Sequence, residues 1–175
     1  MSAEDHIAVY TGSFDPFHLG HEDIVRRAAR LYEKVIVGVG VNPDKRSLFT
    51  PEDRVQMIQE ALADVPNVEV RSFGVLTVTF AREMNSRLLL RGIRALADIE
   101  YEFTMTLTNS SLDADVETVF LMAHREYTHL SSTLIRQIAE LGGNLNDFVP
   151  SAVRDWLTKR FPRAASPKER TKSHS

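Results

Sequence analysis

The chain has 175 residues, a net charge of −3 and a pI of about 6.1. This slightly acidic balance argues against nucleic acid as a partner, because nucleic-acid binding usually requires a basic surface. The chain contains no Cys, which excludes disulfides and thiol chemistry and favours a cytoplasmic location. No apolar run is long enough to span a bilayer, so we also expect no membrane partner.

The first predicted elements are a buried strand over residues 7–10 and an amphipathic helix that ends near Tyr32. Gly12 and Pro16 mark a tight turn between them. The first backbone N–H groups of such a helix lack partners and carry its positive dipole end, so an anion binds there readily. We therefore predict a phosphate site at this turn.

His18 and His21 lie at the start of this helix, three residues apart and with Gly20 between them. The spacing allows both imidazoles to reach one ligand, and Gly20 allows phosphate oxygens to approach the backbone. A pair of zinc ligands is one alternative, but no Cys exists and no acidic third ligand stands nearby in helical register. Two surface histidines without a role are the other alternative.

The rest of the chain alternates apolar strands with amphipathic helices. Further strands are predicted over residues 35–41, 68–71, 88–90 and 119–122, and further helices over 51–62, 77–84, 97–109, 134–141 and 152–161, the last capped by Ser151. This alternation predicts an α/β fold: a Rossmann-like, doubly wound parallel sheet of five strands, with C-terminal helices. We expect one domain over residues 1–161 and a disordered tail over 162–175, which is rich in Arg, Lys, Ser and Pro.

Basic residues follow two of these strands. Lys45 and Arg46 lie in the loop after the second strand, and Arg91 and Arg94 follow the fourth. Open parallel sheets bind ligands at the carboxyl ends of their strands, so these side chains are candidates for phosphate binding. For Lys45 and Arg46 the alternative is an ordinary solvated pair. The hydroxyl residues 131–133 either bind phosphate oxygens or simply cap the helix that follows them.

Two motifs resemble those of a known family. Gly12-Ser13-Phe14-Asp15-Pro16, followed by His18-Leu19-Gly20-His21, resembles the HxGH signature of the nucleotidyltransferase superfamily. Arg91-Gly92-Ile93-Arg94, followed by Asp98, Glu100, Tyr101 and Glu102, resembles a segment of bacterial phosphopantetheine adenylyltransferases that other HxGH enzymes lack. The resemblance covers residues 6–160, nearly the whole predicted domain.

The resemblance implies reversible transfer of an adenylyl group from ATP to 4′-phosphopantetheine. The products are dephospho-coenzyme A and pyrophosphate, and the reaction belongs to coenzyme A biosynthesis. It also implies Mg²⁺ bound with ATP, and a homohexamer. The alternatives are another HxGH nucleotidyltransferase, of the nicotinamide mononucleotide adenylyltransferase or cytidylyltransferase type, and a non-catalytic nucleotide sensor.

The resemblance also implies a role for each matching residue. The residues expected to act in catalysis are His21, Lys45, Arg91, Ser13 and His18. The residues expected to contact ATP are Ser13, Phe14, His21, Gly92, Ile93, Arg94, Glu102, Tyr127, Thr128, His129, Leu130, Ser131, Ser132 and Thr133. The residues expected to contact phosphopantetheine are Ser13, Lys45, Thr77 and Arg91, and no metal ligand is expected in the protein. Many members have Thr at the place of Ser13, and many have Trp-Ser-Phe where residues 127–129 stand.

The chemistry expected at this site depends on placement and charge. The attacking phosphate is already ionised at neutral pH, so in-line attack without a covalent intermediate requires no general base. His21, at the helix N-terminus, can donate a hydrogen bond to the α-phosphate of ATP as negative charge develops there. Lys45 and Arg91 can hold the acceptor phosphate, with Ser13 as a neutral donor.

Overall fold

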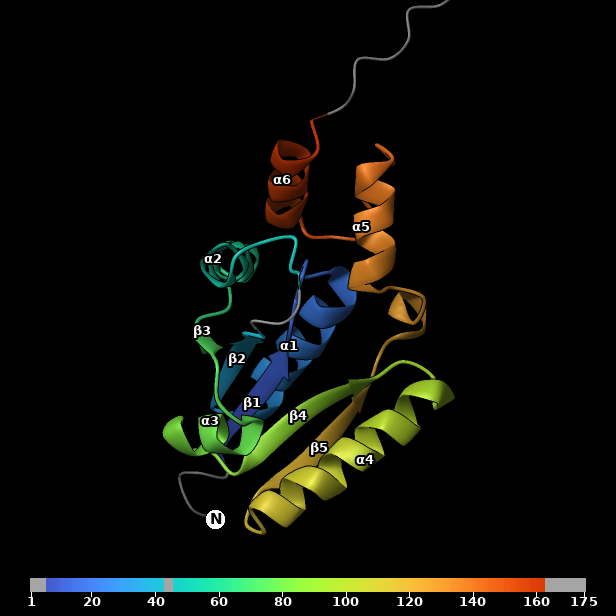
Figure 1. Cartoon of the computed structure of the whole chain (residues 1–175). Helices are drawn as coiled ribbons and strands as arrows, with labels where there is room; N and C mark the ends of the chain where they lie inside the picture. The colour runs from blue at the N-terminus through green and yellow to red at the C-terminus, as the bar shows by residue number, and fades with distance from the viewer. Residues whose placement is uncertain (1–5, 43–45, 163–175) are drawn as a thin grey trace, which may run out of the picture.

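The computed structural model describes residues 6–42 and 46–162. Its centre is a five-stranded sheet in the order β3-β2-β1-β4-β5, in which every neighbouring pair is parallel (Figure 1). The strands are β1 Ile7–Gly12, β2 Lys34–Gly40, β3 Val68–Phe73, β4 Leu88–Ile93 and β5 Glu117–Met122. The prediction of a Rossmann-like parallel sheet is confirmed. Lys45 and residues 163–175 of the predicted tail lie outside the described residues.

Helices cover both faces of this sheet (Figure 1). The helices between strands are α1 Leu19–Leu31, α2 Pro51–Ala61, α3 Thr77–Glu83 and α4 Leu96–Leu112. A short 3-10 turn, η2 Arg125–Tyr127, and the helices α5 Ser132–Glu140 and α6 Ser151–Arg160 follow β5. The helices α3 and α4 lie on one face and α1 and α2 on the other, whereas α5 and α6 pack with α1 and α2 beyond the carboxyl ends of the strands. Among the described residues, none of these helices has the length and apolar character needed to cross a bilayer.

Side chains of the central strands alternate between two hydrophobic cores. Val35, Val37 and Val39 of β2 pack in the larger core, with residues of α1, α2, α5 and α6. Ile36 of the same strand points to the opposite face and packs in the smaller core, with residues of α3. Gly38 also faces α3, where an added Cβ would lie 2.5 Å from a ring carbon of Phe80. Because both faces of β2 are covered, its sequence is continuously apolar rather than alternating.

The strand order places a topological switch between β1 and β4. From β1 the chain proceeds to β2 and β3 on one side, and then crosses to β4 and β5 on the other. The loops that leave the carboxyl ends of β1 and β4 therefore diverge and leave a crevice, which is where open parallel sheets bind ligands. The HxGH turn follows β1 and the arginine segment ends β4, so the two motifs meet at this crevice.

Several predicted element boundaries differ from the structure by a few residues, and two differences have a clear physical reason. The fourth strand does not stop at residue 90, because residues 91–93 continue to pair with residues 120–122 of β5. Arg91 therefore lies inside the strand, where pairing with a neighbour overrides the weak strand preference of Arg and Gly. Ser151 is the first helical residue of α6 and not its cap. The N-cap is Pro150, which makes no side-chain hydrogen bond to the helix.

Candidate active site

The turn between β1 and α1 places two histidine side chains against each other. His18 is the N-cap of α1, and its Nδ1 accepts a hydrogen bond from the backbone N–H of His21 at 3.3 Å. The Nδ1 of His21 accepts in return from the backbone N–H of His18, also at 3.3 Å. The two rings stack with their centroids 3.5 Å apart. Because each Nδ1 accepts, each neutral ring carries its proton on Nε2.

Both histidines are held in their neutral form. Burial, and then the positive charge of Arg94, lower the pKa of His18 to about 3. Burial, followed by the adjacent His18 ring and the positive charge of Arg94, lowers the pKa of His21 well below its ordinary value. At neutral pH each ring can therefore donate a hydrogen bond through Nε2–H to a phosphate oxygen without giving up a proton.

A cavity of about 320 Å³ opens beside this turn, in the crevice between β1 and β4. The predicted site residues that line it are Ser13, Phe14, His18, His21, Arg91, Gly92, Arg94, Glu102, Ser131 and Ser132. They come from the HxGH turn, from β4, from α4 and from the start of α5. The volume lies within the range of small-molecule sites. The fold thus brings most of the predicted site together around one cavity.

Arg91 and Glu102 form a bidentate ion pair, although the resemblance assigns them to different substrates. Nε and Nη2 of Arg91 donate to the two carboxylate oxygens of Glu102 at 2.6 and 2.7 Å, and Nη1 donates to the carbonyl oxygen of Thr11 at 2.9 Å. Burial would lower the pKa of Arg91, but the hydrogen bonds to Glu102 outweigh burial and keep this pKa above its ordinary value. Helix α4 therefore fixes a charged guanidinium against β4.

Arg94 connects two walls of the cavity. Its Nε and Nη2 donate to the carboxylate of Asp98 at 3.2 and 3.1 Å, and its Nη1 donates to the carbonyl oxygen of Leu130 at 2.6 Å. Partial burial would raise the pKa of Asp98, but the hydrogen bonds from Arg94 outweigh burial and lower it. Because Leu130 belongs to the loop after β5, Arg94 holds that loop at a fixed distance from the start of α4.

Two buried charged residues, to which the resemblance assigns no role, stabilise the turn between β1 and α1. The carboxylate of Asp15 accepts hydrogen bonds from the backbone N–H groups of Leu48 at 2.7 Å and Phe49 at 3.1 Å. Arg54 donates to the carbonyl oxygen of Ser13 at 2.7 Å. Buried charges are stable only with such partners, so both side chains help to fix the turn and the loop after β2.

Thr77 lies in a separate cavity of about 20 Å³, which shares Thr11, Arg91 and Glu102 with the main cavity. Its other lining residues are Leu89, Met105, Thr106 and Asn109. The Arg91–Glu102 ion pair is therefore the wall between the two cavities. Sequence reasoning found Glu102 of α4 but missed Met105, Thr106 and Asn109, although these have the spacing of one helix face with Glu102.

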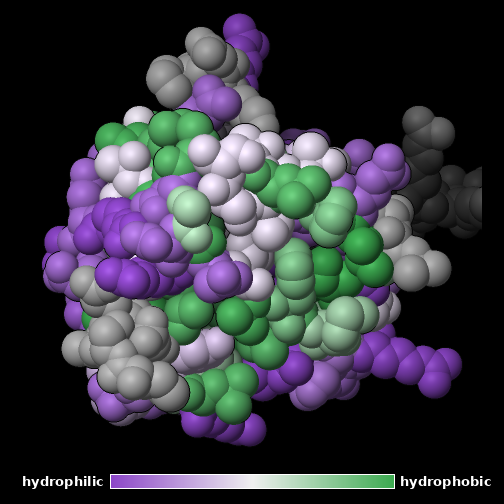
Figure 2. All heavy atoms as spheres, turned by 90° about the horizontal axis from the view of Figure 1, so that it is seen from below, coloured by the Kyte–Doolittle hydropathy of each residue, from purple (hydrophilic) through white to green (hydrophobic). Residues whose placement is uncertain are grey.

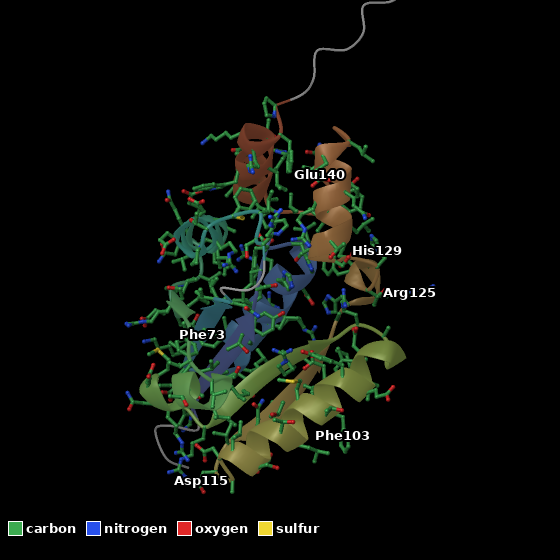
Figure 3. All side chains as sticks on the ribbon, in the orientation of Figure 1. Phe73, Phe103, Asp115, Arg125, His129 and Glu140 are labelled. Atoms are coloured by element: carbon green, nitrogen blue, oxygen red, sulfur yellow. The ribbon has the colours of Figure 1, made fainter. Side chains whose placement is uncertain are left out.

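The other predicted ATP contacts do not line the main cavity. Ile93 and Leu130 are buried side chains, so only their backbone can face a ligand. The remaining predicted ATP contacts that do not line the main cavity are Tyr127, Thr128, His129 and Thr133. Figure 3 shows His129 at the outer edge of the loop after β5. Their contact with ATP stays a prediction, and Lys45 lies outside the described residues.

Four lining residues of the main cavity were missed from the sequence: Tyr10, Thr11, Ile24 and Ala123. Tyr10 and Thr11 lie at the carboxyl end of β1, and Ala123 directly follows β5. Their position at strand ends was the available signal. Burial raises the pKa of the Tyr10 hydroxyl above its ordinary value, so this group stays protonated beside the cavity. Ile24 carried no signal, because it also fits the apolar face of α1.

Comparison with known proteins identifies the family of this chain. Residues 9–138 match the cytidylyltransferase-like family. The chain is 47% identical to a phosphopantetheine adenylyltransferase from Clostridium tetani over 154 residues, which is 88% of this chain and 96% of the relative. It is 48% identical to a phosphopantetheine adenylyltransferase from Rhodopirellula baltica over 166 residues, which is 95% of this chain and 88% of the relative.

A solved structure shares the fold at much lower identity. It is a bifunctional NMN adenylyltransferase/ADP ribose pyrophosphatase from Francisella tularensis, with a TM-score of 0.70 and 18% sequence identity. The match covers 91% of this chain and 50% of that longer one. From the family match and the two relatives we conclude that the chain belongs to the cytidylyltransferase-like family and, within it, to the phosphopantetheine adenylyltransferases.

Proposed function

We propose that the chain transfers the adenylyl group of ATP to 4′-phosphopantetheine, reversibly, and releases dephospho-coenzyme A and pyrophosphate. The observation that carries this proposal is the pair of neutral histidines in one cavity with two anchored arginines, in a chain of this family. This combination supplies donors for several phosphate groups and no acid or base that has to exchange a proton. The reaction is a step of coenzyme A biosynthesis, and its use of ATP favours a cytoplasmic location.

In the proposed mechanism, a phosphate oxygen of the acceptor attacks the α-phosphorus of ATP in line with the bond to the β-phosphate. The new phosphorus–oxygen bond forms as that bond breaks, and pyrophosphate leaves with the bonding electron pair. Nε2–H of His21 donates to the α-phosphate, where negative charge develops. Arg91 and Lys45 hold the acceptor phosphate and Arg94 faces the ATP phosphates, so that most of the catalysis comes from positioning.

We propose that Mg²⁺ enters with ATP, bound to the phosphate oxygens of the substrate. In the described part of the chain, no three His, Asp or Glu side chains gather in a way that could hold a metal ion. Glu102, a carboxylate that lines the cavity, is already paired with Arg91. Mg²⁺ on the triphosphate would neutralise the leaving pyrophosphate.

The acceptor is tested by pyrophosphate release from MgATP with three phosphorylated compounds. We expect turnover with 4′-phosphopantetheine, with dephospho-coenzyme A identified by mass spectrometry, and rates at least about a hundredfold lower with nicotinamide mononucleotide and glycerol 3-phosphate. Preferred turnover of another acceptor would replace this assignment with a different HxGH activity. Binding of ATP without turnover of any acceptor would favour the nucleotide sensor.

We further propose that the chain assembles as a homohexamer, and the surface of α4 supports an assembly of copies. Among its described side chains none is fully buried, and large apolar ones are exposed: Tyr101 by 63%, Phe103 by 59% and Leu107 by 54%. The edge strand β5 adds Met122, exposed by 58%. Figure 2 shows hydrophobic surface across the side of the molecule where α4 lies, and Figure 3 shows Phe103 on the side of α4 away from the sheet. Contiguous apolar surface of this kind marks a protein interface.

A further inference from the structure

The two ends of the loop over residues 123–131 line the main cavity, and both ends are held by hydrogen bonds. Ala123 lines the cavity, and its backbone N–H donates to the carbonyl oxygen of Ile93 at 2.8 Å. At the other end, Ser131 lines the cavity and the carbonyl oxygen of Leu130 accepts from Arg94. The middle of the loop packs on the first turn of α1, since a Cβ placed on Gly20 would lie 3.4 Å from Cβ of Tyr127. The loop therefore lies beside the first turn of α1, at the edge of the cavity that both of them line.

A cluster of three charged or titratable side chains joins this loop to α1. Oδ1 of Asp23 lies 3.1 Å from Nδ1 of His124, and Oδ2 of Asp23 accepts from Nη1 of Arg27 at 3.0 Å. The same Nη1 donates to the carbonyl oxygen of Met122, the last residue of β5, at 2.7 Å. The side chain of Asp23 is only 11% exposed, whereas that of His124 is 56% exposed. The carboxylate of Asp23 thus contacts His124 directly and reaches the end of β5 only through Arg27.

We propose that His124 is a positioning residue for the nucleotide side of the cavity, and that it acts through Asp23 by fixing loop 123–131 against α1. Asp23 stands two residues after His21 on the same helix, and His124 stands next to Ala123. The Asp23–His124 pair therefore fixes the distance between His21, the donor to the α-phosphate, and Ala123, which lines the cavity at the start of loop 123–131. Arg27 alone leaves this link incomplete, because it holds the end of β5 and none of the loop beyond it.

The proposal rests on the proposed function, in which loop 123–131 and Arg94 face ATP while Arg91 and Thr77 face the acceptor. Loss of the pair should therefore affect the two substrates differently. A loop that is free to move away from α1 binds ATP more weakly, whereas the proposed acceptor residues Arg91 and Thr77 keep their contacts. The chemical step, once ATP is bound, still uses His21 and Arg91, so kcat should change less than KM.

The experiment compares His124→Ala, His124→Asn and the wild-type chain in steady-state kinetics with MgATP and 4′-phosphopantetheine. We expect His124→Ala to raise KM for ATP by about three- to tenfold, the size of one lost polar interaction, with kcat and KM for the acceptor within about twofold. Because the amide nitrogen of Asn reaches the position of Nδ1, His124→Asn should return KM for ATP to within about twofold of the wild type. The matched control is His6→Ala, which removes another histidine–carboxylate pair, His6 with Glu33, at the opposite end of β1. The His6→Ala variant should leave kcat, KM for ATP and KM for 4′-phosphopantetheine unchanged.

A second measurement needs no turnover. Amide hydrogen exchange of residues 124–131 in the ligand-free protein should be about three- to tenfold faster in His124→Ala than in the wild type and normal in His124→Asn. An unchanged KM for ATP in His124→Ala, equal impairment of the Ala and Asn variants, or unchanged exchange would overturn the proposal. If the wild-type chain turns over a different acceptor, the proposed function fails, while the exchange experiment still decides whether His124 fixes the loop.

Discussion

A side chain that stabilises developing charge must present its hydrogen in one defined direction. In His21 this direction is set by the backbone of His18, which occupies Nδ1 and leaves the proton on Nε2. Burial then prevents the ring from gaining a second proton at neutral pH. His21 is therefore preorganised as a neutral donor, whereas His18 also has the structural task of capping the helix.

We predict that His21→Ala lowers kcat by about 10²- to 10³-fold, the usual effect of removing one preorganised donor to a developing anion. ATP affinity, measured by calorimetric titration, should change far less. His18→Ala is the matched comparison: it should lower kcat less, but it should cost about 1 kcal/mol of stability because the N-cap is lost. If kcat of His21→Ala stays within a few-fold of the wild type, His21 does not donate in the transition state.

We predict that Glu102→Gln raises KM for 4′-phosphopantetheine and lowers kcat/KM about tenfold, because a neutral amide cannot hold Arg91 by two charged hydrogen bonds. Glu100→Gln, an exposed position on the same helix, is the control and should stay within about twofold. If Glu102 acts through Arg91, the double variant Glu102→Gln/Arg91→Ala should be no worse than Arg91→Ala alone. Additive losses would mean that Glu102 acts on ATP directly, as the resemblance implies.

Helix α1 begins with two histidines that fold in their neutral state, which links its stability to pH. In the unfolded chain a histidine gains a proton below its ordinary pKa of 6.5, whereas folded His18 gains one only near pH 3. Between these values the unfolded state binds more protons, so the stability is complete above pH 6.5 and falls as the pH decreases. His21, with its pKa also lowered, contributes in the same direction.

We predict that His18 alone accounts for a loss of about 2 kcal/mol of unfolding free energy between pH 7 and pH 5. In His18→Asn the helix keeps a good N-cap but loses the histidine that titrates. Between pH 7 and pH 5 the unfolding free energy of this variant should therefore fall by about 2 kcal/mol less than that of the wild type. Urea denaturation of both proteins at pH 7 and pH 5, at one protein concentration, measures the difference. Equal losses in the two proteins would show that His18 is not buried in its neutral form.

The elements whose predictions agree with the structure are those with a strong local signal. The start of α2 is one example: Thr50 caps it and Pro51 is its first residue, as expected. The extension of β4 through Arg91 had no such signal, because it depends on pairing with β5, a strand distant in sequence. The same holds for the site. His18 and His21 were found from their spacing, whereas Asp23 and His124 are brought together only by the folded chain.

For the molecule as a whole, α4 is a long helix that the single chain leaves largely uncovered. It carries Glu102, Thr106 and Asn109, which line the smaller cavity together with the proposed acceptor residues Thr77 and Arg91, so these residues adjoin a helix without a fully buried described side chain. Its outer face is apolar, which is costly in water and favourable in an interface. An assembly that covers this face would therefore also hold the acceptor site in place.

We predict that Phe103→Glu/Leu107→Glu, two substitutions four residues apart on the exposed face of α4, dissociates the assembly and lowers activity. Two carboxylates buried in an apolar interface would lose their hydration without gaining a partner, whereas in a separated chain both positions remain in water. Light scattering at micromolar concentration should give the mass of a hexamer for the wild type and a smaller mass for the variant. KM for 4′-phosphopantetheine should rise more than KM for ATP, because α4 lines the acceptor side.

Leu141→Glu, at an apolar residue that is 88% exposed after α5, is the control and should change neither mass nor activity. A wild-type monomer at this concentration would contradict the homohexamer. A variant that remains hexameric would show that copies meet through another surface.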